Sequence, residues 1–341
     1  MAVLGATGTV GQRFIQILEN HPWFQVTEVL ASDQSAGKTY AEAVGSRWKL
    51  LTDIPPAVAR LTVRKPGDRL RSRILFSSLD ASVAGDVETH YARAGHFVSS
   101  NARNHRMAPD VPLVIPEVNR DHLELLDRQR FKAGGIVTNP NCSTIVVAMA
   151  LAPLHRAFGV EQVLVATYQA ASGAGYPGVP SLDILGNVVP YIAGEEAKME
   201  SETHKILGRL GSKGIEPAGF ALSAHCHRVA VLDGHLLAMS VKFHRRPTRK
   251  SLLAAFAAFR PLAKLGLPSA PNPPIVVRGE VDRPQPRLDA DRAGGMAITL
   301  GRLRPCSVLD WKFDAVGHNV VRGAAGAAIL NAEILEREGR F

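Results

Sequence analysis

The sequence predicts an α/β fold made of two domains, and three observations support this prediction. The chain has 341 residues, which is long for one domain and sufficient for two. A glycine-rich segment near its start separates a short apolar run from an amphipathic one, as expected where a strand turns into a helix. Further β-like runs at residues 26–31, 74–76, 96–99 and 135–138 predict that one sheet continues through the first part of the chain.

The composition excludes several classes of protein. The formal net charge is +9, but the basic residues are scattered and aromatic residues are sparse, which favours small anionic ligands over nucleic acid. Cys142, Cys226 and Cys306 are widely spaced without any C-x-x-C, which argues against a disulfide framework or zinc site and for a reducing compartment. No apolar stretch approaches the roughly 18 residues of a membrane helix. We therefore expect a cytoplasmic protein with no nucleic-acid partner, no membrane contact and no metal.

The glycine-rich segment reads Gly5-Ala6-Thr7-Gly8-Thr9-Val10-Gly11. Glycines at this place allow a tight turn, close approach of the backbone to a pyrophosphate and close packing of the helix on the strand. The spacing is G-x-x-G-x-x-G rather than the commoner G-x-G-x-x-G, and glycine turns also occur for packing alone. Because the segment opens the chain and precedes a second strand, we predict a Rossmann-type dinucleotide site. The short first strand leaves open whether residues precede Met1.

The end of the second predicted strand should meet the adenosine ribose and so select the cofactor. Asp33 would favour NAD, whereas Ser32, Ser35 and Lys38 suit the 2′-phosphate of NADP. An ordinary polar loop is the alternative interpretation. We predict that NADP is the cofactor.

Two later strand ends carry candidate ligands. Ser77 and Leu79 follow the strand of residues 74–76, where a ligand is expected in such a sheet. Arg106 follows the strand of residues 96–99, and a cation there is a candidate ligand for an anion. A solvated surface arginine is the alternative for Arg106.

The segment Asn139-Pro140-Asn141-Cys142-Ser143-Thr144 joins a predicted strand to an apolar helical run. Pro140 cannot continue a strand ladder and Asn141 is a good N-cap, so Cys142 should lie in the first helical turn. The free N–H groups and the positive dipole end there favour a thiolate. Cys142 is therefore a candidate nucleophile, the alternative being a small buried cysteine beside a turn.

The region after this helix offers further polar candidates. A predicted strand at residues 162–168 ends at Gln169, and the small residues Ser172 and Gly173 after it permit close approach of the backbone. Residues 177–190 contain several prolines and are expected to form a loop. A helical pattern from residue 194 places Glu195, Lys198, Glu202 and Lys205 on related faces, which by itself indicates a solvated ion-pair face.

Asp233-Gly234 between two alternating apolar runs predicts a two-residue hairpin. Such a turn pairs Leu232 with His235 and puts Arg228 on the same face as His235. A small substrate with a carboxylate would then bridge Arg228 and a catalytic imidazole. The alternative for His235 is a histidine that merely flanks a turn.

The tail, residues 317–330, predicts a helix rich in small residues that packs closely on a sheet. We expect it to return to the first domain and to bring Asn319 near the cofactor. The expected domains are therefore residues 1–141 with 318–341, which bind NADP, and residues 142–317, which carry catalysis and dimerisation.

Several of these motifs together resemble the aspartate-semialdehyde dehydrogenase family, closest to its archaeal and fungal branch, over nearly the whole chain. The matching segments are GATGTVG (residues 5–11), NPNCST (139–144), YQAASGAG (168–175), VVPYIAGEE (188–196), ETHKIL (202–207), RVAV (228–231) and RGAAG (322–326). One departure is Ala230, where the family often has proline, and it concerns backbone stiffness more than chemistry.

The resemblance implies a fold like that of glyceraldehyde-3-phosphate dehydrogenase and a homodimer or homotetramer. It implies that Cys142 is the nucleophile and His235 the acid/base, that Arg228, Gln169 and Glu195 hold the amino-acid part, and that Arg106 and Lys198 hold phosphate. The residues expected to bind the cofactor are Gly5, Thr7, Gly8, Thr9, Val10, Gly11, Ser32, Ser35, Lys38, Ser77, Leu79, Ser172, Gly173 and Asn319.

The implied reaction reduces L-aspartyl 4-phosphate to L-aspartate 4-semialdehyde through a cysteine thioester, with release of phosphate, in the biosynthesis of lysine, threonine and methionine. Two alternatives remain. A malonyl- or succinyl-CoA reductase of the same fold would keep Cys142 and His235 but use a CoA thioester. A regulatory NADP-binding module would keep the glycines without turnover.

Overall fold

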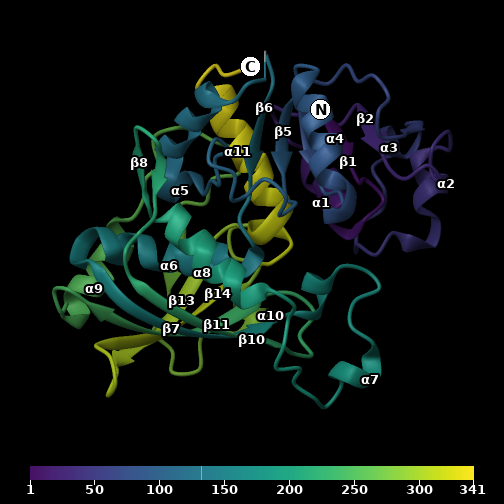
Figure 1. The fold of residues 1–341 in the computed structure, drawn as a ribbon. Coiled ribbons are helices and arrows are strands. Elements are labelled where there is room, and N and C mark those ends of the chain that lie inside the picture. The colour runs from purple at the N-terminus through teal and green to yellow at the C-terminus, as the bar shows by residue number, and fades with distance from the viewer. Residues whose placement is uncertain (132) are drawn as a thin grey trace. The chain divides into compact units, whose positions relative to one another are not determined.

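The computed structural model describes residues 1–131 and 133–341, which form two compact units (Figure 1). The first unit comprises Met1–Val114, His122–Asn139 and Ala324–Phe341, and the second comprises Ile115–Asp121 and Pro140–Gly323. The domain ranges expected from the sequence differ from these units by a few residues at each junction and by the segment Ile115–Asp121. The separate function of each range stays a prediction.

The first unit contains a parallel six-stranded sheet in the order β3-β2-β1-β4-β5-β6. Its strands are β1 (Ala2–Leu4), β2 (Glu28–Leu30), β3 (Val63–Arg64), β4 (Ile74–Ser77), β5 (Phe97–Ser100) and β6 (Gly135–Thr138). This is the strand order of a dinucleotide-binding domain, and it confirms the predicted Rossmann-type fold. Strand β3 lies in a proline-containing stretch that shows no strand pattern, because two paired residues are too few to alternate.

Helices cover both faces of this sheet and create two apolar cores. On one face, Val3 and Phe76 pack with residues of α1 (Thr9–Leu18) and α11 (Gly326–Arg337). On the other face, Leu75 packs with Tyr91 of α4 (Ala81–Arg93). Burial on both faces explains why these strands read as continuous apolar runs. The short helices are α2 (Tyr40–Val44), η1 (Gly45–Arg47), α3 (Pro56–Ala59) and η2 (Arg120–Arg128).

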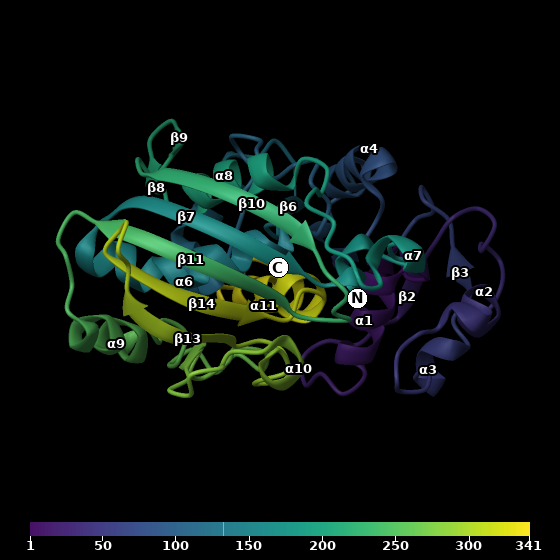
Figure 2. The same cartoon turned by 90° about the horizontal axis from the view of Figure 1, so that it is seen from below.

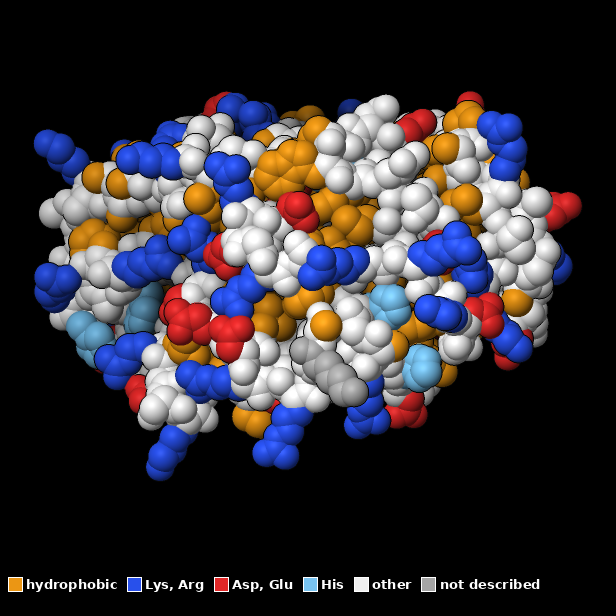
Figure 3. All heavy atoms as spheres, turned by 90° about the horizontal axis from the view of Figure 1, so that it is seen from above, with side chains coloured by type: hydrophobic (Ala, Val, Ile, Leu, Met, Phe, Trp, Pro, Cys, Tyr) orange, Lys and Arg blue, Asp and Glu red, His pale blue; other side chains and the backbone are white. Residues whose placement is uncertain are grey.

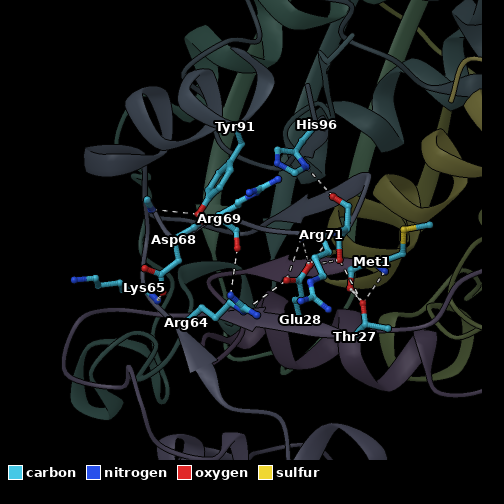
Figure 4. A network of polar contacts seen from close by, with 12 residues as sticks. Met1, Thr27, Glu28, Arg64, Lys65, Asp68, Arg69, Arg71, Tyr91 and His96 are labelled. Atoms are coloured by element: carbon cyan, nitrogen blue, oxygen red, sulfur yellow. Dashed lines mark hydrogen bonds and ion pairs between the residues drawn. The ribbon is translucent and has the colours of Figure 1, made fainter. Parts of the chain in front are cut away.

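A polar network ties together the amino-terminal ends of the strands (Figure 4). The buried carboxylate of Glu28 accepts hydrogen bonds from the backbone N–H groups of Arg71 and Ser72, at 3.1 and 2.8 Å, and from the Ser72 hydroxyl at 2.6 Å. Burial alone would raise the pKa of Glu28, but these bonds and the nearby Arg64 lower it overall. The network therefore stabilises the sheet at the end opposite the glycine-rich turn.

The second unit contains a mixed six-stranded sheet in the order β10-β7-β11-β14-β13-β12, drawn face on in Figure 2. Its strands are β7 (Val160–Gln169), β10 (Ala221–Arg228), β11 (His235–Phe243), β12 (Ile275–Val277), β13 (Ile298–Pro305) and β14 (Trp311–Gly317). Helices α6 (Cys142–Phe158), α8 (Glu195–Ile206) and α9 (Arg249–Ala258) lie on one face of this sheet. The opposite face stays partly exposed, with Leu164 and Tyr168 of β7 on it.

The predicted hairpin at Asp233-Gly234 is wrong. Strands β10 and β11 do not pair with each other, because β7 lies between them, parallel to β10 and antiparallel to β11. The connection between them crosses the end of β7, where the N–H of Val229 donates to Gln169 O and the N–H of Ala171 donates to Val231 O. A strand distant in sequence has thus displaced the local pairing that the turn residues favour.

The remaining elements of the second unit are short. They are α5 (Pro116–Asn119), η3 (Ala171–Ala174), α7 (Ser181–Ile184), β8 (Arg209–Gly211), β9 (Gly214–Glu216), α10 (Pro286–Asp289) and the π-helical turn η4 (Val321–Ala325), which continues into the first unit. Helix α7 interrupts the segment predicted as a loop. In the described part of the chain, no helix has the length and apolar character to span a membrane. Figure 3 shows Lys and Arg side chains separated by uncharged and apolar ones on the face in view.

Candidate active site

The nucleophile candidate lies at the start of a buried helix, as predicted. Helix α6 begins at Cys142, and Asn141 is its N-cap. The Asn141 side chain accepts hydrogen bonds from the backbone N–H groups of Ser143 and Thr144, at 2.9 and 3.2 Å. Most of α6 is apolar and buried, so the helix holds Cys142 rigidly at its positive dipole end.

A histidine from a distant strand faces this cysteine. The Nε2 atom of His235, the first residue of β11, lies 3.2 Å from the Cys142 sulfur. The backbone N–H of Ala170 donates to the other ring nitrogen, Nδ1, at 3.0 Å. Burial, then the positive charge of Arg228, then His318 lower the pKa of His235 to about 3. Cys142 and His235 thus have the geometry of a thiol and its catalytic partner.

Strand register places two more polar residues in line with His235. Arg228 pairs with Gln169 across β10 and β7, and Leu236 pairs with Tyr168 across β11 and β7, so His235 falls opposite Gln169. These three side chains occupy the helix-covered face and are buried. Arg228 therefore does share a face with His235, although by a different topology from the predicted hairpin.

The row formed by Gln169, Arg228 and His235 offers groups that suit a small acidic molecule. The Arg228 Nη1 atom donates to Ala170 O at 2.8 Å. The Gln169 Nε2 atom lies 3.3 Å from the Thr167 hydroxyl, and its buried Oε1 has no hydrogen-bond partner among the described residues. A guanidinium and an amide beside a thiol can orient a carboxylate-bearing carbonyl compound for attack by sulfur.

Helix α8 directs two buried carboxylates at the cap of the nucleophile helix. The Glu195 carboxylate accepts from the Asn141 side-chain amide at 2.8 Å, and the Glu202 carboxylate accepts from the Asn141 backbone N–H at 2.6 Å. Lys198 forms an ion pair with Glu195 at 2.7 Å. This face of α8 is thus not a solvated one. Glu202 was predicted to share a helix face with Glu195, but it was not predicted as a residue of the site.

The chain packs closely against Cys142 at a second glycine-rich turn. A Cβ atom at Gly323 would lie 2.6 Å from the Cys142 Cβ, so no larger residue fits there without a shift. Next to it, the buried Arg322 binds both carboxylate oxygens of Glu117, at 2.8 and 2.7 Å. This bidentate pair holds the turn in place behind the thiol.

The residues Ser172, Gly173 and Asn319, predicted to bind cofactor, lie in the second unit beside His235. The Asn319 side chain accepts from the Gly234 N–H at 2.8 Å and donates to the Ser172 hydroxyl at 2.8 Å. A Cβ atom at Gly173 would lie 3.0 Å from His235 Cε1. These contacts hold the turn that precedes His235. By themselves they are not specific to a bound dinucleotide.

In the first unit, the glycine-rich turn forms an open cradle at the start of α1. Gly5 has a φ of +74°, and a Cβ there would lie 2.7 Å from Ser78 O. A Cβ at Gly11 would lie 2.3 Å from Gly5 O. Gly8 caps α1 without a side chain, and Thr7, Thr9 and Val10 are only partly buried. The cradle therefore suits a pyrophosphate, whose charge the helix dipole favours.

Two further residues hold this cradle, and one of them, Gln12, was absent from the sequence prediction. The buried Gln12 donates to Thr7 O at 3.0 Å, and the Ser78 hydroxyl donates to Leu4 O at 2.9 Å. The predicted Ser77 and Leu79 flank Ser78, and Ser77 is fully buried. Side-chain bonds to a turn leave no period in the sequence, which is why Gln12 was missed.

The loop after β2 presents Ser32 and Lys38 to solvent, whereas Ser35 is buried. The N–H of Ser35 donates to Ser32 O at 2.9 Å and the N–H of Lys38 donates to Ser35 O at 3.4 Å, so the loop is a tight turn. Asp33 is also exposed. The exposed Ser32 hydroxyl and Lys38 ammonium remain suitable ligands for a phosphate, and Ser35 contributes chiefly to the turn.

Arg106 belongs to the first unit, in the loop after β5. Its Nη2 atom donates to Asn101 O at 2.7 Å. The same loop rests on the fully buried Glu88, which accepts from the Ser100 hydroxyl at 2.7 Å and lies 3.6 Å from His105. Burial raises the pKa of Glu88. Arg106 is thus a buried, positioned residue and not a solvated surface arginine.

The other two cysteines have different surroundings. Burial raises the pKa of Cys226 to about 11, so its thiol stays protonated near neutral pH. Cys306 accepts a hydrogen bond from the Leu309 N–H, which lowers its pKa, but no histidine contacts it among the interactions described. Only Cys142 of the three combines a helix start with an adjacent imidazole.

We expect Glu202→Ala to lower the free energy of unfolding by about 1 to 3 kcal/mol, because the buried Asn141 N–H loses its acceptor. Urea denaturation monitored by circular dichroism measures this change. Glu202→Gln should lose less, since its amide oxygen can accept the same bond. Ser201→Ala, at an exposed position of the same helix, is the control, and an equal loss in both alanine variants would contradict the assignment.

Comparison with known proteins gives one consistent result. Residues 1–126 match the family model for the NAD-binding domain of semialdehyde dehydrogenases, and residues 151–322 match the model for their dimerisation domain. An aspartate-semialdehyde dehydrogenase of Archaeoglobus fulgidus is 49% identical, with 99% of this chain and 98% of the relative covered. That of Schizosaccharomyces pombe is 46% identical, with 99% and 98% covered. The crystal structure of the Candida albicans enzyme with NADP superposes with a TM-score of 0.91 at 41% identity, covering 100% of this chain and 99% of the other.

Proposed function

Because the chain belongs to the aspartate-semialdehyde dehydrogenase family, we propose that it reduces L-aspartyl 4-phosphate to L-aspartate 4-semialdehyde with NADPH. The identity to archaeal and fungal relatives confirms the branch that the motifs predicted. The observation that carries the proposal is the contact of 3.2 Å between the Cys142 sulfur at a helix start and His235 Nε2. This geometry supports covalent catalysis at an acyl carbon.

The protein's own groups account for the acyl transfer. The Cys142 thiolate attacks the acyl phosphate, the C–O bond to phosphate breaks, and a thioester forms. Lys198 and Arg106 are the proposed ligands of the departing phosphate. His235 Nε2 faces the oxygen of the tetrahedral species, where charge develops. NADPH, when bound, supplies the hydride that reduces the thioester.

The row on the second sheet supports a role in recognition of the amino-acid part. Arg228 can bind the α-carboxylate through two parallel N–H groups, since a guanidinium matches that geometry. Gln169 has an unpartnered amide oxygen for the α-ammonium. Glu195 offers negative charge beside them, while its bond to Asn141 links recognition to the nucleophile helix.

The first unit would hold NADP through the glycine cradle and the loop after β2. Gly5 and Gly11 let the turn pack closely on Ser78 and on itself, which leaves Thr7, Gly8, Thr9 and Val10 at the start of α1 to surround the pyrophosphate. The NADP-bound Candida albicans structure has the same fold over the whole chain. NADP is therefore the cofactor in this proposal, with Ser32 and Lys38 as ligands of its 2′-phosphate.

If Lys38 binds the 2′-phosphate, NADP should be preferred over NAD by at least about tenfold in kcat/KM, or about 1.4 kcal/mol. Lys38→Ala should reduce this preference, because it removes the only ammonium of the exposed turn at residues 32–38. Initial rates with each cofactor measure the ratio. Lys65→Ala, an exposed lysine elsewhere in the first unit, is the control. Equal use of NAD and NADP by the wild type would mean that Asp33 faces the ribose.

One assay tests the proposed reaction against the CoA-dependent alternative. Formation of NADPH from aspartate semialdehyde and NADP should require inorganic phosphate, and CoA should not replace it. The relatives at 42 to 50% identity support the acyl phosphate and not a malonyl- or succinyl-CoA reductase. A rate that depends on CoA and not on phosphate would reverse this conclusion.

The exposed face of the second sheet supports a homo-oligomer. Leu164 and Tyr168 of β7, the second strand of the sheet, are 50% and 41% exposed, and Tyr168 stacks on His227. The segment that matches a dimerisation domain contains this whole sheet. A second copy of the chain would cover the face, as a dimer or within a tetramer.

None of the described cysteines forms a disulfide, which supports a cytoplasmic location.

A further inference from the structure

The hydroxyl of Tyr40 holds one peptide group of the glycine-rich turn. Tyr40, the first residue of α2, is fully buried, and its O–H donates to Ala6 O at 2.8 Å. Burial raises the pKa of Tyr40, so the hydroxyl keeps its proton and serves as a donor. The Tyr40 N–H donates to Leu61 O at 2.8 Å, and its ring meets the ring of Trp48 edge-on. A fixed side chain outside the turn therefore orients the peptide between Ala6 and Thr7.

Gln12 holds the next peptide group of the same turn. Its Nε2 atom donates to Thr7 O at 3.0 Å and to Arg47 O at 2.9 Å. Its Oε1 atom accepts from the Lys49 N–H at 3.1 Å. The buried amide thus uses donor and acceptor together, and it anchors the turn to the segment that follows η1.

These bonds determine which backbone groups of the turn remain available to a ligand. In a planar trans peptide the carbonyl oxygen and the N–H point in opposite directions. Because Ala6 O faces Tyr40, the Thr7 N–H points away from it, and this N–H has no hydrogen-bond partner among the described residues. The Gly8 N–H, in contrast, donates to Gly5 O at 3.0 Å. Thr7 is partly exposed, so its N–H is available to an anion.

Paired carbonyls beside a free N–H suit a pyrophosphate. A carbonyl oxygen that faced the anion would repel it, but Ala6 O and Thr7 O each accept a hydrogen bond from a protein side chain. A hydrogen bond at the carbonyl also polarises the peptide and strengthens its N–H as a donor. The two side chains therefore favour anion binding at a turn that they do not belong to.

We propose that Tyr40 and Gln12 are positioning residues for the cofactor, because they hold the carbonyls of the turn away from the pyrophosphate and so present the Thr7 N–H to it. Both act through the backbone of the turn. This inference rests on the proposed function, which supplies NADP as the ligand.

Tyr40→Phe tests the inference, since it removes only the hydroxyl and keeps the buried ring. We expect the Kd for NADPH, measured by titration of its fluorescence, to rise about three- to tenfold through the loss of one neutral hydrogen bond. Tyr91→Phe is the matched control in the same unit. The Tyr91 hydroxyl donates to Asp68 O at 3.0 Å, at the opposite end of the sheet (Figure 4). Both variants should lower the urea midpoint of unfolding, but only Tyr40→Phe should weaken NADPH binding.

A fragment of the cofactor separates this role from a general loss of structure. Adenosine 2′-monophosphate carries the 2′-phosphate but no pyrophosphate, and its Kd is measured by competition with NADPH. We expect this Kd to stay within about twofold of the wild-type value in Tyr40→Phe. Gln12→Met, which keeps the length of the side chain but removes its donor, should likewise weaken the binding of NADPH and not of the fragment.

An unchanged Kd for NADPH in either variant would overturn the inference. Equal weakening in Tyr91→Phe, or parallel weakening of the fragment, would also overturn it and would leave Tyr40 with a structural role only. A wild type that does not bind NADPH would contradict the proposed cofactor itself, and this inference with it.

Discussion

Cys142→Ala should reduce turnover by at least about 10⁴-fold, because without the sulfur no thioester can form. Cofactor binding should stay nearly unchanged, since the glycine cradle belongs to the first unit and Cys142 to the second. The measurements are NADPH formation from aspartate semialdehyde with phosphate, and titration of NADPH by its fluorescence. The two readouts together distinguish a lost nucleophile from a misfolded protein.

The other cysteines provide matched controls for this experiment. Cys226→Ala should keep most of the activity, because the Cys226 thiol is buried in β10 and its raised pKa keeps it protonated. Cys306→Ala should also keep most of it, since Cys306 follows β13 and contacts the backbone of Leu309. Turnover that survives in Cys142→Ala would exclude the covalent mechanism.

Arg228→Ala should raise the KM for aspartate semialdehyde about ten- to a hundredfold, because a charge-assisted contact contributes about 1.5 to 3 kcal/mol. The KM for phosphate should change much less. The kcat should fall too, since the Ala170 carbonyl loses its buried donor beside His235. Initial rates with each substrate varied in turn separate these effects.

Lys198→Ala is the matched contrast, and it should raise the KM for phosphate much more than the KM for aspartate semialdehyde. If both cations bind the phosphate, Arg106→Ala should also raise the KM for phosphate much more than the KM for aspartate semialdehyde. An unchanged dependence on phosphate in Lys198→Ala would leave Lys198 as the ion-pair partner of Glu195 only. A CoA-dependent reductase would then describe the protein better.

Features that depend on neighbouring residues could be predicted from the sequence. Local chemistry predicts the N-cap at Asn141, the start of α6 at Cys142 and the turn at Gly5, because each depends on residues adjacent in sequence. The strand β6 and the beginning of α8 follow from local patterns in the same way. Local chemistry is therefore sufficient to predict the position of the candidate nucleophile and the glycine-rich turn.

Features that depend on distant pairing could not be predicted in this way. The turn residues Asp233 and Gly234 favour a hairpin, but β7 lies between the two flanking strands and pairs with both of them. The contacts of Glu202 with Asn141 and of Ala170 with His235 likewise join segments about 60 residues apart. Only the folded sheet determines which side chain or peptide group meets the ring.

The packing of Gly323 against Cys142 has a consequence for the order in which the protein is synthesised. Cys142 leaves the ribosome about 180 residues before Gly323, which at 5 to 20 residues per second is roughly 10 to 40 s. Until then the turn behind the thiol is missing. The first unit also waits, because Ala328 and Ile329 of α11 complete its core. Both units therefore need residues between 323 and 329 before their packing is complete, so both are finished at the same late stage of translation.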